Sequence, residues 1–177
     1  MKEKKISLIL ILPILFPYLI LFSLFCLFTN KFIDILFNNN GLFILLYLII
    51  IYIIALICII IYFIINIIFK MDPVKILKIN MIIKLIQIPA YIIIFIISLM
   101  SLITIFTMGI SLLLIIFDCM AIFLTGLIGL SGIIRGFIDK KLTLSDTIVY
   151  SIFQFIFCLD ILFSILAYKK IKSNTCA

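Results

Sequence analysis

Long apolar runs separated by short polar segments make up almost the whole chain. A first run covers residues 6–28, and a second covers 42–69 without a charged residue. Between residues 87 and 134, Asp118 is the single charged residue among 48 positions. One helix of that length would be about 70 Å long, more than twice the thickness of the hydrocarbon core of a bilayer, so the chain must reverse direction within it.

The best turn within this third run is the sequence TIFTMGIS at 104–111. It separates two spans, and a last apolar run follows a polar connection. Apolar runs of about 20 residues are typical of transmembrane helices. The pattern therefore predicts an all-α integral membrane helical bundle of about five transmembrane helices. The expected spans are 6–28, 42–69, 89–106, 111–134 and 147–168.

A shorter helix is expected over 73–87, as an approach to the third span. Asp72 before Pro73 is a favourable pair for the N-cap and the first position of a helix. Pro89 disfavours helical geometry at the residue before it, so the approach helix should bend at that point.

The polar residues of this approach helix do not form one amphipathic stripe. At about 100° per residue, Lys75 and Lys78 lie near one meridian, whereas Asn80, Lys84 and Gln87 lie almost opposite. A short interfacial turn that leads into the span is therefore favoured over an amphipathic helix on the membrane surface.

The composition agrees with a membrane-embedded chain. Of the 177 residues, 68% are hydrophobic and 12% are charged. Because repeated spans leave no room for a soluble domain, residues 1–177 are taken as a single integral membrane domain. The net charge of +7 comes from basic residues at the ends of apolar runs, where they set topology and contact lipid headgroups. The expected partners are the lipid bilayer, other membrane proteins or copies of the same chain, and not nucleic acid.

The distribution of Lys and Arg predicts the orientation. With five spans, ten of the fourteen Lys and Arg residues lie on the side of the N-terminus and four lie on the other side. The positive-inside rule then places the N-terminus in the cytoplasm. A four-span alternative, with 111–134 as a re-entrant segment, gives the same ten-to-four distribution. Length favours five spans, because 24 mostly apolar residues are enough to cross a bilayer.

The second half of the chain carries distinctive sequence blocks, from KINMIIKLIQIPAYI through FDCM and GLIGLSGIIRGF to KKLTLSDTIVYSIFQFIFCLDILFSILAY. Over residues 70–168 these blocks resemble an uncharacterised family, a domain of unknown function, of small multi-span bacterial membrane proteins. The resemblance implies a location and an architecture, but no activity.

Two carboxylates inside the spans are the main candidates for chemistry. Asp118 and Asp160 each stand about eight residues from the outer end of their span, and so at similar depth. An ionised Asp near the bilayer centre costs about 2.5–3.5 kcal/mol on insertion scales. Along the helices, Arg135 lies ~25 Å from Asp118 and Lys169 lies ~14 Å from Asp160, so no basic partner is expected. We expect the two acids to face the bundle interior and to lie close together, at least one being protonated, with a proton or cation site as the functional interpretation. The alternative is two neutral acids that hydrogen-bond neighbouring helices.

Small residues in the fourth span predict close helix packing. They are Gly126, Gly129, Gly132 and Gly136. The chain has no His, and its five Cys form no CxxC pair. Cys119 and Cys158 lie near the level of the two acids but point in other directions. No metal, cofactor or catalytic group is therefore expected.

These features favour a non-enzymatic, multi-pass protein of the cell membrane with a structural, regulatory or accessory role. One alternative is a small proton or cation transporter, or a channel component, that uses Asp118 and Asp160. A weaker alternative is an immunity protein against a toxin or bacteriocin, since such proteins can be small, basic and multi-span.

Overall fold

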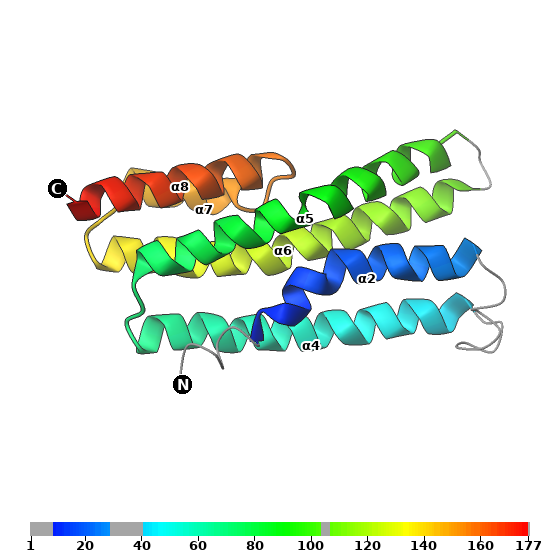
Figure 1. Cartoon of the computed structure of the whole chain (residues 1–177), viewed down its shortest axis with the longest axis horizontal. Helices are drawn as coiled ribbons and strands as arrows, with labels where there is room; N and C mark the ends of the chain where they lie inside the picture. Colours follow the sequence, from blue (N-terminus) through cyan, green and yellow to red (C-terminus); the bar gives the residue numbers. More distant parts are fainter. Residues whose placement is uncertain (1–8, 29–40, 104–106, 177) are drawn as a thin grey trace.

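A computed structural model of the chain describes residues 9–28, 41–103 and 107–176. These residues form helices and no strand. The helices are α2 (Ile11–Phe28), α4 (Gly41–Ile68), α5 (Pro73–Ser101), α6 (Met108–Ile138), α7 (Leu144–Phe153) and α8 (Leu159–Cys176). Four rods, α2, α4, α5 and α6, lie side by side, and α7 and α8 form a pair against one half of the bundle (Figure 1). The prediction of an all-α bundle is confirmed.

Three helices are long and apolar enough to cross a membrane, at Leu42–Ile68, Pro73–Ser101 and Met108–Ile138. α2 is a shorter apolar helix. Large Ile, Leu and Phe side chains are exposed along all four rods, as expected of surfaces that face lipid tails. At this level the expectation of a membrane protein is confirmed.

The predicted approach helix and third span are one helix, α5, which continues through Pro89. Asp72 is its N-cap, because its side chain accepts a hydrogen bond from the Val74 backbone N–H and Pro73 takes the first position. The bend expected before Pro89 does not end the helix. Within a bundle, neighbouring helices can cover the backbone groups that a proline frees, and Tyr18 of α2 donates to the nearby Ile86 carbonyl at 2.5 Å.

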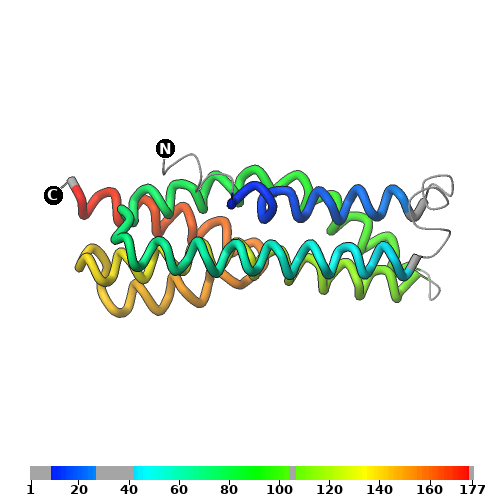
Figure 2. The backbone as a smooth tube through the Cα atoms, turned by 90° about the horizontal axis from the view of Figure 1, so that it is seen from below, coloured from blue at the N-terminus to red at the C-terminus, as the bar shows by residue number. Residues whose placement is uncertain are grey.

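The segment expected as a last span over 147–168 is instead a helical hairpin. α7 begins at its N-cap Thr143 and ends at Phe153, and the chain turns before α8. Cys158 adopts a positive φ of 64° in this turn. α8 then runs back beside α7, so the C-terminal end of the chain lies at the same end of the bundle as the α6–α7 connection (Figures 1 and 2). The segment enters the bundle and returns without crossing it.

Basic residues of the described segments gather at that same end of the bundle. The connection between α4 and α5, the connection between α6 and α7, and the last turns of α8 all lie there (Figure 2). These segments, together with the first turns of α5 and the last turn of α6, carry Lys70, Lys75, Lys78, Arg135, Lys140, Lys141, Lys169, Lys170 and Lys172. We call it the basic end. Long ion pairs join the base of the hairpin, Lys170 to Asp146 and Lys141 to Asp72, each at 3.8 Å.

The antiparallel helices α5 and α6 form the central contact of the bundle. Near one end, the Ser98 and Ser111 hydroxyls lie 2.8 Å apart. Nearer the basic end, a Cβ added to Gly132 would lie 2.9 Å from Leu77. The buried positions of α5 recur at intervals of about three and four residues along one face, which forms a seam with α6, whereas α6 from Leu124 onward is buried at most positions.

Candidate functional site

A lysine buried between α5 and the hairpin is the centre of the candidate site. The side chain of Lys84 has no exposed surface. Its ammonium group lies 3.2 Å from a carboxylate oxygen of Asp160, at the start of α8. It also donates to the side-chain oxygen of Gln154 at 2.8 Å, and lies 3.3 Å from the backbone carbonyls of Gln154 and Asp160. Lys84 therefore binds both sides of the hairpin turn.

A small polar network surrounds this ion pair. The amide of Asn80, one turn before Lys84, donates to the Gln154 side chain at 3.2 Å and to the Ser164 hydroxyl at 3.1 Å. Ser164 lies 2.9 Å from the Gln154 oxygen and 2.6 Å from the Asp160 carbonyl. All five side chains are buried. Helices α5, α7 and α8 are thus joined through polar groups in an otherwise apolar interior.

Two glycines of α6 make room for the hairpin turn. A Cβ at Gly129 would collide with the side chains of Gln154 and Asn80. A Cβ at Gly126 would lie 2.6 Å from the ring of Phe155. The two glycines towards the basic end have other neighbours, since Gly132 faces Leu77 and Gly136 faces Ile171. Because glycine has no Cβ, these positions on α6 allow α5 and the hairpin to approach it closely.

The position of Asp160 explains why a basic partner is needed. Asp160 is nine residues from Lys169 along α8, or ~14 Å, which is about half the ~30 Å thickness of a hydrocarbon core. Buried inside the bundle, neither an ammonium nor a carboxylate is stable alone, because desolvation costs several kcal/mol per ion. The expectation that Asp160 has no base within reach is wrong, because the base comes from α5 and not from its own helix.

Asp118 and Asp160 both lie close enough to Tyr91 of α5 to interact electrostatically with it. The register of α5 and α6 places Asp118 opposite Tyr91, two turns or ~10 Å along the seam from the level of Lys84. Its side chain is largely buried, and one carboxylate oxygen is buried without a hydrogen-bond partner. Among the described residues, no hydrogen bond or ion pair joins Asp118 to Asp160. The two candidate acids are both internal, but they have different surroundings.

A second polar contact, formed by Gln87, lies on the same face of α5 as Lys84. Its amide donates to the Pro13 carbonyl of α2 at 2.9 Å, and its oxygen accepts from Tyr91 at 3.1 Å. Pro17 has no N–H, so the Pro13 carbonyl would otherwise lack its helical partner. Gln87 therefore supplies a missing backbone hydrogen bond inside the bundle, and it is not the interfacial residue that its sequence position indicates.

A cavity of about 280 Å³ reaches Asp160 from the outside of the hairpin turn. It is lined mainly by apolar and aromatic groups, among them Tyr91, Phe95 and Phe157. The rings of Phe95 and Phe157 stack with centroids 6.2 Å apart. Asp160 is the one charged residue in this lining.

Lys84 was not singled out in the sequence, although a signal for it exists. Asn80, Lys84, Gln87 and Tyr91 recur at the three-and-four spacing of one helix face. The sequence thus shows that Asn80, Lys84 and Gln87 share one side of the helix, but it does not show that this side faces Asp160.

Comparison with known proteins identifies no family. The chain matches no family model, no curated protein and no solved structure. The resemblance drawn over residues 70–168 stays a prediction, and the geometry of the site carries the functional argument.

Proposed function

We propose that the chain is a cell-membrane protein with four spans, α2, α4, α5 and α6, and a re-entrant hairpin formed by α7 and α8. The N-terminus and the basic end face the cytoplasm. The hairpin arrangement moves Lys169, Lys170 and Lys172 to the side that already holds the other basic connections. Thirteen of the fourteen Lys and Arg residues then share one side, compared with ten in a five-span arrangement. Because positive charge marks the cytoplasmic side, the larger asymmetry supports four spans.

We further propose that the protein works without catalysis, as a proton- or cation-coupled component of a membrane transport process, with Asp160 and Lys84 as its coupling site. The observation that supports this proposal is the set of hydrogen-bond acceptors around Lys84. Three uncharged oxygens, from Gln154 and the Asp160 backbone, lie within 3.3 Å of its ammonium group. They hold Lys84 whether the Asp160 carboxylate is charged or has taken up a proton or a cation. The carboxylate can therefore change its charge while the lysine stays bound.

One further observation supports this function. Ionisable side chains at mid-membrane depth are expensive and are typical of ion and proton pathways. Asp118 lies farther along the α5–α6 seam, and we assign it the role of a second acid in the same proton pathway.

Ion flux in proteoliposomes tests the proposal. Purified protein is reconstituted with a pH-sensitive dye inside the vesicles, and a valinomycin-driven potential is applied with proton or sodium gradients. The wild type should move protons or sodium faster than protein-free vesicles, and Asp160→Asn should remove this flux. Lys169→Met is the matched control, because it removes an exposed charge of the basic end and should leave the flux unchanged.

A second candidate function is a purely structural or accessory role, and the polar network favours it. Asn80, Gln154 and Ser164 join three helices by hydrogen bonds, as polar residues do when they hold membrane helices together. Wild-type vesicles that are no leakier than empty ones under either gradient would support this role. So would an Asp160→Asn variant that folds and keeps the wild-type flux.

A further inference from the structure

The ammonium group of Lys84 lies inside a cage of four oxygen atoms. Two belong to side chains, the amide oxygen of Gln154 at 2.8 Å and a carboxylate oxygen of Asp160 at 3.2 Å. The other two are the backbone carbonyls of Gln154 and Asp160, each at 3.3 Å. All four oxygens come from the hairpin. The hairpin therefore provides the whole cage, and α5 provides the charge that occupies it.

The interruption between α7 and α8 makes these oxygens available. Gln154 is the C-cap of α7, so its carbonyl lies beyond the last helical residue, Phe153. The C-terminal end of a helix carries partial negative charge, because its last carbonyls have no partners within the helix. In membrane transporters, the C-terminal ends of interrupted helices and unwound backbone carbonyls coordinate cations. The end of α7, together with the Asp160 carboxylate, offers the same kind of surroundings.

Hydrogen bonds hold the cage at its present size. Asn80 donates to the Gln154 side-chain oxygen at 3.2 Å, and the Ser164 hydroxyl lies 2.9 Å from that oxygen and 2.6 Å from the Asp160 carbonyl. The backbone N–H of Asp160 donates to the Ile156 carbonyl at 2.9 Å, which closes the turn. These contacts oppose a contraction of the cage around a smaller ion.

We propose that this cage is a binding site for a monovalent cation of the size of potassium or ammonium, and that Lys84 is its resident occupant, which such a cation replaces. The charge follows from Asp160, because one carboxylate balances one positive charge and a divalent ion would leave a buried excess. The size follows from the distances of 2.8–3.3 Å, which exceed the about 2.0–2.6 Å of Mg²⁺ and Ca²⁺ sites. Potassium and ammonium also have longer oxygen distances than sodium.

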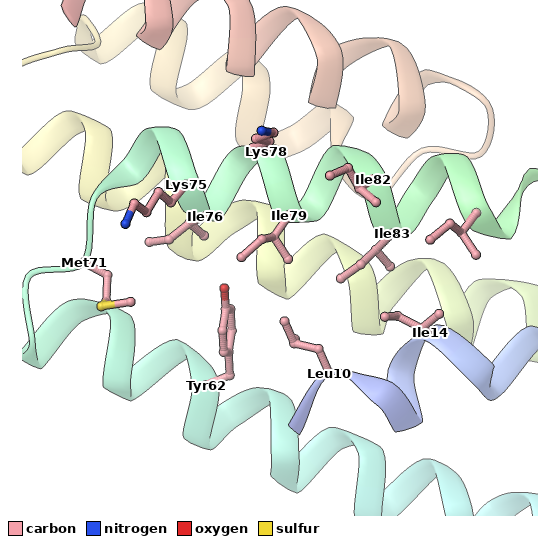
Figure 3. Close-up of a pocket in the computed structure, with 11 residues that line it drawn as sticks. Leu10, Ile14, Tyr62, Met71, Lys75, Ile76, Lys78, Ile79, Ile82 and Ile83 are labelled. Atoms are coloured by element: carbon pink, nitrogen blue, oxygen red, sulfur yellow. The ribbon is translucent and has the colours of Figure 1, made fainter. Parts of the chain in front are cut away.

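The opposite side of α5 shows what a cation site would lack elsewhere in the bundle. A pocket of about 490 Å³ lies there between α2, α4 and α5, and Tyr62 points into it from α4 (Figure 3). The described residues that line it include Lys75 and Lys78 and no acid. The cage at the hairpin, in contrast, joins a carboxylate to three uncharged oxygens.

Thermal unfolding of the detergent-purified full chain tests the site, in potassium, ammonium, sodium or choline chloride at equal ionic strength. Lys84→Ala keeps the four oxygens and removes their occupant. Potassium or ammonium at 100 times Kd should raise its unfolding midpoint by about 5–10 °C relative to choline, and sodium should raise it less. Lys84→Ala/Asp160→Asn should lose this difference between salts. The matched control Lys169→Ala removes an exposed lysine and should respond as the wild type does.

A folded Lys84→Ala that is equally stable in all four salts would overturn the inference, and so would a salt preference that persists without Asp160. If Lys84→Ala folds in none of the salts, binding of radioactive rubidium, a potassium-sized ion, to the wild type decides. Binding that requires Asp160 and that potassium displaces better than sodium supports the site, and absence of binding overturns it.

The inference deepens the proposed function and rests on it for the role of the cation in coupling, but the binding itself is measured without a gradient. Vesicles without flux would therefore contradict the proposed function and leave the cation site standing. Flux in vesicles, combined with a Lys84→Ala variant that shows no salt preference, would do the reverse.

Discussion

Removing the charge of Lys84 should destabilise the fold more than removing the charge of Asp160. In Lys84→Met, the Asp160 carboxylate loses the one basic group within 4 Å in the described structure, and the Gln154 oxygens lose a donor. Deleting one partner of a buried ion pair typically costs about 3–5 kcal/mol. In Asp160→Asn, the lysine keeps its three uncharged acceptors, so the cost should stay near that of one charged hydrogen bond, about 1.5–3 kcal/mol.

The double variant Lys84→Met/Asp160→Asn tests whether the two side chains stabilise the fold as an ion pair or independently of each other. With the ammonium absent, an Asn at position 160 removes an uncompensated buried charge, so the double variant should cost less than the sum of the single variants by at least ~1 kcal/mol. The measurement is reversible unfolding in mixed micelles, followed by far-ultraviolet circular dichroism, with Lys169→Met as a surface control. Additive costs, or a larger cost for Asp160→Asn than for Lys84→Met, would refute the proposed arrangement.

Three further predictions follow from single contacts. Gly129→Ala should lower thermal stability in detergent because its Cβ would collide with the hairpin turn, whereas Gly109→Ala, with nothing within 4 Å of the added Cβ, should be neutral or slightly stabilising. If both variants behave alike, the close approach of the hairpin to α6 is wrong. In a Cys-free background, Ser173→Cys should resist an impermeant thiol reagent in intact cells but react after permeabilisation; labelling in intact cells would contradict the re-entrant hairpin. Gln87→Leu should cost about 1–3 kcal/mol in unfolding measurements, and adding Pro17→Ala should recover part of it by restoring a backbone donor; no recovery would mean that the Gln87 amide is not replacing the missing N–H.

The sequence predicts the long helices well because their apolar runs are long and uninterrupted. The second run was expected over 42–69, and α4 covers Gly41–Ile68. The joining of the approach helix and the third span into α5 was missed because Pro89 is a strong local signal against helix. Inside the bundle that local preference is outweighed by the apolar surroundings, in which a helix is the best way to satisfy the backbone.

The hairpin was missed for a different reason. Residues 147–168 have the length and hydrophobicity of a span, and the turn contains neither Gly nor Pro. In one continuous helix, Gln154 and Asp160 would lie about 9 Å apart along the axis and on different faces. The turn brings both to the same ammonium group, so the break depends on Lys84, about 70 residues earlier in the chain. No local pattern encodes a contact of that range.

For the candidate acids, the sequence predicts burial but not the neighbouring side chains. Hydropathy alone indicates that Asp118 and Asp160 are internal, and both are buried. Their relative depth was derived from spans that do not exist as expected, since Asp160 lies at a hairpin turn. Its surroundings could therefore not be deduced by counting residues from the end of a span.

The contact between Lys84 and the hairpin also has a consequence for biogenesis. Lys84 lies in α5 and is synthesised before its acceptors at Gln154 and Asp160, which follow about 70 residues later in the chain. Until they arrive, α5 carries an unsatisfied ammonium group at a depth where it is unstable. A chain in which α7 and α8 have not packed against α5 therefore differs from the folded chain by one buried ammonium group without its acceptors. Packing of the hairpin removes that difference in a single step.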